Sequence, residues 1–213
     1  MENKIVELKN LYFEKKKEIE KKLKEFKKNF ESEEKIFYEL CFCLLTPQSK
    51  ARNCWKSIEY LKRKNLIFNG SEDDIKEALK NVRFRNKKAY YLVYTRNLFF
   101  KNKKLSIKPV IKSFKNLYDL REYLVKNIKG LGYKEASHFL RNIGFGNKIA
   151  ILDRHILKNL KELKVIDKIP RSLNKNKYIE IEKKFIEFSY KIGIKPSELD
   201  LLLWAKETGF VFK

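Results

Sequence analysis

The stretch that decides the fold is Ile128-Lys-Gly-Leu-Gly-Tyr-Lys-Glu-Ala-Ser-His-Phe-Leu-Arg-Asn142. Gly130 and Gly132 lie between two segments whose apolar residues recur at helical spacing. These apolar residues are Leu120, Leu124 and Ile128 before the glycines and Ala136, Phe139, Leu140 and Ile143 after them. Glycines allow positive φ and close approach of a ligand, and the N–H groups that open the next helix favour an anion. The stretch therefore predicts two helices joined by a hairpin that holds a DNA phosphate, with an ordinary helix-to-helix turn as the alternative.

The rest of the chain predicts an all-α protein. Only seven glycines and four prolines occur among 213 residues, which leaves few of the tight turns that an all-β fold needs. Helices are expected over residues 5–26, 36–45, 48–61, 71–81, 87–99 and 117–128, with others starting near 113 and at 153. No apolar run approaches the roughly 20 residues of a membrane span, so no membrane partner is expected.

The charge of the chain favours a polyanionic partner. Lys and Arg number 50 against 27 Asp and Glu, a formal net charge of +23. Cations that bind phosphates release condensed counterions, so a nucleic acid is the first candidate. Only nine of the cations are Arg, and Lys, Asn and Ile are all abundant, as in any protein from an AT-rich genome. The charge alone therefore leaves open a merely solvated surface.

Two residues beside the hairpin are candidates for chemistry. Lys134 falls in the first turn of the second helix, where the helix dipole disfavours a cation, so its placement is poor for stability alone. An uncharged amine there is a nucleophile, and a plain surface lysine is the alternative. Asp153 follows the apolar run 149–152 and opens another helix. It is either the N-cap of that helix or a carboxylate that faces the amine.

Residues 128–142 and 152–157 together resemble the helix-hairpin-helix DNA glycosylase superfamily, and more narrowly its archaeal-type 8-oxoguanine DNA glycosylase/lyases. Further blocks of similarity are 39–46, Arg83-Phe84 with 87–89, and 197–200 with Trp204, so that the resemblance spans roughly residues 35–213. It implies two helical domains that flank a DNA-binding cleft. The first is expected at 35–145, ending in the helix-hairpin-helix, and the second at 1–34 with 146–213.

The resemblance implies an enzyme that turns oxidised guanine out of double-stranded DNA, excises it and nicks the strand by β-elimination. The implied catalytic residues are Lys134, which forms a Schiff base with the sugar, and Asp153. The implied base pocket comprises Trp204, Phe84 and the α-carboxylate of Lys213, and the implied DNA contacts are Gly130, Gly132 and Gln48. A core role is the alternative for Trp204 and Phe84. A same-fold glycosylase for another oxidised base and a non-catalytic DNA-binding module are the alternative functions.

The sequence departs from the wider superfamily at two points. Lys129 stands where many members have Pro before the hairpin. No cysteine follows Asp153, so the four-cysteine iron–sulfur cluster of other branches cannot be built. His138 and His155 have no grouped acidic residues beside them, so neither a metal nor a cofactor is expected. The expected protein is a monomer of the cytoplasm that associates with the nucleoid.

Overall fold

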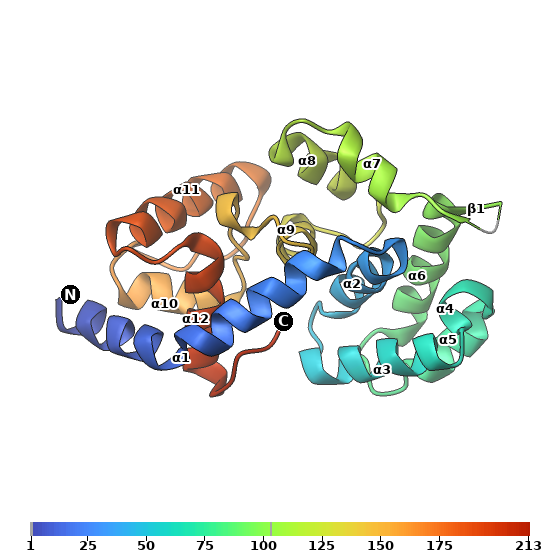
Figure 1. Cartoon of the computed structure of the whole chain (residues 1–213), viewed down its shortest axis with the longest axis horizontal. Coiled ribbons are helices and arrows are strands. Elements are labelled where there is room, and N and C mark those ends of the chain that lie inside the picture. Colours follow the sequence, from blue (N-terminus) through green and yellow to red (C-terminus); the bar gives the residue numbers. More distant parts are fainter. Residues whose placement is uncertain (1, 103) are drawn as a thin grey trace. The chain divides into compact units, whose positions relative to one another are not determined.

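Helices form almost all the regular structure of the computed structural model, which describes residues 2–102 and 104–213 (Figure 1). The first helices are α1 (Glu2–Asn29), α2 (Glu33–Leu45), α3 (Ala51–Arg63), α4 (Leu66–Asn69), α5 (Glu72–Ala78) and α6 (Arg85–Phe99). Those that follow are α7 (Ile107–Ser113), α8 (Leu117–Asn127), α9 (Tyr133–Asn142), η1 (Gly146–Lys148), α10 (Arg154–Glu162), α11 (Lys175–Lys191) and α12 (Pro196–Thr208). Strands β1 (Phe100–Lys101) and β2 (Lys104–Leu105) form one short antiparallel pair. The predicted all-α class is confirmed.

The chain forms two compact units. One comprises residues 29–139, and the other combines α1 up to Lys28 with residues 140–213. The sequence predicted divisions after residues 34 and 145. The structure divides the chain at the end of α1 and within α9, so the second helix of the hairpin motif supplies residues to both units. None of the described helices is long and apolar enough to cross a bilayer.

Helix α2 is the centre of the first unit. Ser32 caps its N-terminus by accepting a hydrogen bond from the N–H of Lys35, and every residue from Ile36 to Leu45 is buried. A helix that is apolar all round belongs in a core, and α2 packs against α3, α6 and α7. Helix α5 packs in turn against α3 and α6.

Helix α12 has the same place in the second unit. It begins with Pro196, which suits the first helical position, and it ends at Gly209 in the left-handed conformation. Its contacts are with α10, α11 and η1, and most of its residues are buried. The hydroxyl of Tyr12 on α1 donates to Glu198 at 2.9 Å, which ties the N-terminal helix to this core.

Two predicted helix starts are wrong. A helix was expected from about Ser113, but Ser113 is the last residue of α7. Pro109 lies in the first turn of α7, where its missing N–H costs no helical hydrogen bond, so it does not break the helix. The helix expected from Gln48 begins at Ala51, because Gln48 has a φ of 53° and belongs to a turn. Helix α5 ends at Ala78, before the expected residue 81.

We predict that Gly130→Ala destabilises the chain much more than Gly193→Ala. Both glycines have positive φ, 81° and 76°, but a Cβ on Gly130 would lie 2.3 Å from the ring of Tyr91, whereas nothing lies within 4 Å of one on Gly193. We expect a loss of about 1 kcal/mol for Gly193→Ala and about 3 kcal/mol for Gly130→Ala. Denaturant unfolding measures both, and equal losses would show that the Tyr91 ring moves aside at no cost.

Candidate active site

The hairpin between α8 and α9 has the geometry that its glycines predict. Gly130 adopts the left-handed conformation, and the N–H of Ala136 donates to the carbonyl of Gly132 at 2.9 Å to make the first bond of α9. Leu131 between the glycines is only 4% exposed, so it anchors the turn. The N–H groups of the first turn of α9 therefore follow directly on a fixed glycine backbone, the arrangement that suits an anion.

Lys134 lies in the first turn of α9, and its nearest charge comes from its own helix. Its Nζ is 2.8 Å from Oε1 of Glu135, with 26% of the Lys134 side chain and 12% of the Glu135 side chain exposed. A carboxylate in the first turn offsets the unfavourable dipole that acts on the amine. The ion pair of Lys134 with Glu135 was not predicted from the sequence, because side chains of adjacent helix residues do not normally face one another.

A second lysine, Lys88 of α6, is 3% exposed. Its Nζ donates to the carbonyl oxygens of Leu45 and Pro47, both at 2.7 Å, and to Oγ of Ser49 at 3.0 Å. The pKa of Lys88 is lowered to about 8, with burial as the main cause and the charge of Lys134 acting in the same direction, while Cys54 and Glu135 act in the opposite direction. Lys88 and Lys134 therefore share one electrostatic neighbourhood within the first unit.

Gln48 and Phe84 both project from left-handed turns in the first unit. Gln48 has a φ of 53° and Phe84 a φ of 60°, and both side chains are exposed. Phe84 is 49% exposed, with the guanidinium of Arg83 4.9 Å from the centre of its ring, so the core alternative for Phe84 is excluded. The turns are joined, because the N–H of Arg83 donates to Oγ of Ser49 at 3.0 Å.

Asp153 of the second unit is the N-cap of α10. Its Oδ1 accepts hydrogen bonds from the N–H groups of His155 and Ile156, both at 2.8 Å. In the described part of the chain both bonds go to this one oxygen, which leaves Oδ2 for another partner. The two roles that the sequence offered for Asp153 are therefore compatible.

Asp200 of α12 lies in the electrostatic surroundings of Asp153. The pKa of Asp200 is raised to about 7, with burial as the main cause and the charge of Asp153 contributing to the rise. Arg141 opposes it, with its Nε 3.6 Å from Oδ2 of Asp200. Asp200 is therefore a buried acid whose protonation depends on the charges of both Arg141 and Asp153.

Trp204, on α12, belongs to an aromatic cluster with the segment that follows the helix. Its ring lies edge-on to Phe210, with centroids 5.3 Å apart, and 6.3 Å from the ring of Phe212. Trp204 and Lys213 are both only partly buried. The segment 210–213 thus folds back to Trp204, so the structure brings two of the predicted base-pocket residues to one part of the second unit.

The two histidines contact an aromatic ring and a carboxylate. His138 is buried with its ring edge-on to Phe42 at 5.6 Å, and Nδ1 of His155 lies 3.8 Å from a carboxylate oxygen of Glu207. Among residues 2–102 and 104–213, no group of three or more His, Cys, Asp or Glu side chains is arranged to hold a metal ion.

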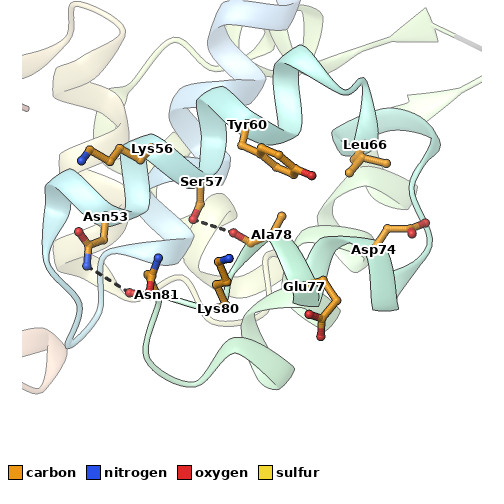
Figure 2. Close-up of a pocket in the computed structure, with 10 residues that line it drawn as sticks. All are labelled: Asn53, Lys56, Ser57, Tyr60, Leu66, Asp74, Glu77, Ala78, Lys80 and Asn81. Carbon is orange, nitrogen blue, oxygen red and sulfur yellow. Dashed lines mark hydrogen bonds between the residues drawn. The ribbon is translucent and has the colours of Figure 1, made fainter.

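A groove of about 500 Å³ lies between α3 and α5 (Figure 2). Its lining residues are Asn53, Lys56, Ser57, Tyr60, Leu66, Asp74, Glu77, Ala78, Lys80 and Asn81. Two of its polar side chains are engaged with backbone carbonyls, Ser57 with that of Ala78 at 2.9 Å and Asn53 with that of Asn81 at 3.3 Å. None of the predicted site residues lines this groove, so its exposed Lys56 is a suitable control position for substitutions at the site.

Lys129, directly before the hairpin glycines, is held by tyrosines of α6. Its Nζ lies 2.6 Å from the hydroxyl of Tyr90 and 4.6 Å from the centre of the Tyr94 ring. The hydrogen bond to Tyr90 is the main cause that raises the pKa of Lys129. A fixed cation therefore stands beside the predicted phosphate-binding backbone.

Comparisons with known proteins agree on one family. The family described as 8-oxoguanine DNA glycosylase matches residues 19–194. A relative from Fusobacterium nucleatum, named 8-oxoguanine DNA glycosylase/AP lyase, is 47% identical over 97% of this chain and 96% of its own. A relative of the same name from Methanocaldococcus jannaschii is 45% identical over 99% of this chain and 98% of its own.

Two crystal structures have the same fold over nearly the whole chain. The 8-oxoguanine glycosylase/lyase of Methanocaldococcus jannaschii, solved in complex with a 15mer DNA that contains 8-oxoguanine, has a TM-score of 0.88 and 42% identity. The match covers 98% of this chain and 99% of that one. The 8-oxoguanine DNA glycosylase of Thermotoga maritima has a TM-score of 0.89 and 33% identity, with both chains covered completely.

We predict that Lys129→Gln weakens binding to duplex DNA and flattens its salt dependence. If Lys129 contacts one phosphate, the slope of log K against log salt concentration falls in magnitude by about 0.9. Fluorescence anisotropy with a labelled duplex at several salt concentrations measures the slope. Lys56→Gln, at an exposed position in the groove of Figure 2, is the control. A slope for Lys129→Gln equal to that of the unmodified protein contradicts the phosphate contact.

Proposed function

Because this chain belongs to the 8-oxoguanine DNA glycosylase family, we propose that it excises 8-oxoguanine from double-stranded DNA and cleaves the strand at the resulting abasic site through Lys134. The observation that carries the proposed mechanism is the position of Lys134. Its partly exposed amine stands in the first turn of α9, directly after a hairpin whose backbone suits a phosphate. An amine held at the DNA backbone is placed to reach a sugar carbon. We further expect the protein to act as a monomer on nucleoid DNA.

Excision first requires that the damaged base leave the helix. A base stacked in a duplex is out of reach of a side chain, so the nucleotide is turned outward into a pocket. We assign Gln48, exposed at its strained turn, to the gap left in the duplex. Gly130 and Gly132 supply the backbone that holds the phosphate, which fixes the register of the protein on the strand.

We assign recognition of the extruded base to aromatic and polar groups. Trp204 offers a ring for stacking, and its packing against Phe210 and Phe212 fixes the orientation of that ring. Phe84 offers a second exposed aromatic surface. We assign the α-carboxylate of Lys213, next to Phe212, to hydrogen bonding with the polar edge of the base.

The chemistry assigned to Lys134 is covalent. Its uncharged amine attacks C1′ of the sugar, the N-glycosidic bond breaks, and the base leaves with the electron pair of that bond. The nitrogen loses a proton, the sugar ring opens, and a Schiff base forms between C1′ and Nζ. Loss of a proton from C2′ then breaks the bond between C3′ and its oxygen, which nicks the strand 3′ to the lesion. We assign Asp153 to accepting the proton of the amine and to stabilising positive charge on the sugar through Oδ2.

We predict that Lys134→Gln abolishes covalent trapping on DNA. Borohydride reduces the Schiff base to a stable bond, so the unmodified protein should yield a cross-linked product with an 8-oxoguanine duplex and none with an undamaged one. Gel electrophoresis measures the product, and Lys56→Gln should trap like the unmodified protein. A cross-link that persists in Lys134→Gln would rule out this lysine as the nucleophile. Stronger cleavage of a duplex that carries an oxidised pyrimidine would point to a different lesion.

We predict that Trp204→Leu slows base excision but not cleavage of a preformed abasic site. Leucine keeps apolar bulk against Phe210 but removes the stacking surface, and an abasic site has no base to stack. We expect a loss of about tenfold or more in single-turnover excision. Phe13→Ala, which truncates an exposed aromatic of the same unit, is the control. Equal losses on both substrates would show that Trp204 acts through the stability of the unit and not by stacking on the base.

A further inference from the structure

Lys88 is an unusual residue to bury. It is 3% exposed, and no ion pair in the described part of the chain includes it. Its three N–H donors meet three neutral oxygens, those of Leu45, Pro47 and Ser49. Taking an ammonium out of water costs free energy, and the three hydrogen bonds to these oxygens offset that cost.

The position of the ammonium explains how its charge is tolerated. Leu45 is the last residue of α2, and a cation at a helix C-terminus interacts favourably with the helix dipole and with the carbonyls left without helical partners. An apolar side chain of the same length would deprive the carbonyl of Pro47 of this donor and leave that of Leu45 with the weak thiol donor of Cys54, whose Sγ is 3.1 Å away.

The three oxygens lie on both sides of Gln48. Leu45 and Pro47 precede it and Ser49 follows it, so one ammonium spans the turn that Gln48 occupies. Gln48 has a φ of 53°, a conformation that residues other than glycine rarely adopt and that costs on the order of 1–2 kcal/mol. The bonds from Lys88 therefore hold a strained turn in one conformation.

The same residue is also bonded to the second exposed turn. The backbone N–H of Lys88 donates to the carbonyl of Phe84 at 3.1 Å. Ser49, the third acceptor of the ammonium, also accepts the N–H of Arg83. Lys88 thus links the turn of Gln48 to the turn of Phe84, and each of these turns presents an exposed side chain.

We propose that Lys88 is a positioning residue for base extrusion: its ammonium fixes the turn of Gln48 against the turn of Phe84, so that both side chains are preset to meet a duplex opened at the lesion. The proposal rests on the proposed function, which places Gln48 in the gap of the duplex. Lys88 acts through these turns and does not touch the reacting atoms. The charges that face its ammonium are Lys134 and Glu135 from α9, and the facing thiol is Cys54 from α3.

The test is a double-mutant cycle between Lys88 and Gln48. Lys88→Met keeps the length of the side chain and removes its donors, and we expect single-turnover excision of 8-oxoguanine to fall about tenfold. In a Gln48→Ala background the same substitution should cost clearly less, because one of the two side chains through which Lys88 acts is already absent. A 2-aminopurine next to the lesion should show the same loss as reduced base unstacking. Lys56→Met is the matched control.

If Lys88→Met unfolds the chain, Ser49→Ala tests the same proposal. It removes one acceptor of the ammonium and the partner of Arg83, so it should also slow excision, and this effect should be smaller in the Gln48→Ala background. Additive losses in the cycle, or unstacking that matches the unmodified protein, would overturn the role of Lys88. If the unmodified protein itself fails to excise the base or to trap on the lesion, the proposed function fails instead.

Discussion

The close contact between the Gly130 backbone and the Tyr91 ring is the constraint on which the first unit depends. No side chain fits at residue 130, so the hairpin rests directly on α6. The same helix begins directly after Phe84, carries Lys88 in its first turn and supports Lys129 through Tyr90. Helix α6 therefore aligns the hairpin with the turns of Gln48 and Phe84. A scaffold of this kind explains how short, strained turns keep a defined geometry.

One charged side chain in each unit follows the polarity of the helix end beside it. The ammonium of Lys88 stands at the C-terminus of α2, and the carboxylate of Asp153 caps the N-terminus of α10. Lys134, a cation in the first turn of α9, opposes this polarity, and Glu135 beside it offsets the cost. Other helices also begin with cations, such as Arg85 in α6 and Lys175 in α11, so what singles out Lys134 is its place directly after the hairpin.

The sequence was enough to predict the all-α class, the hairpin, the first-turn position of Lys134 and the capping position of Asp153, because glycine spacing and helix starts leave local signals. It failed at Pro109, where a residue tolerated in a first turn resembled a helix breaker. It could not single out Lys88, because no local sequence signal distinguishes it among 41 lysines and only tertiary packing decides which lysine is buried. Glu135 and the exposure of Phe84 were hidden for the same reason. The assigned roles of the site residues remain proposals.

The tyrosines around Lys129 bear on how tightly DNA is held. A free lysine side chain samples many rotamers and loses that conformational entropy when it grips a phosphate. The Lys129 amine is already fixed by the Tyr90 hydroxyl and the Tyr94 ring, so much of this ordering is complete before the nucleic acid arrives. Preorganisation of this kind lets a single cation contribute more affinity than its charge alone would suggest.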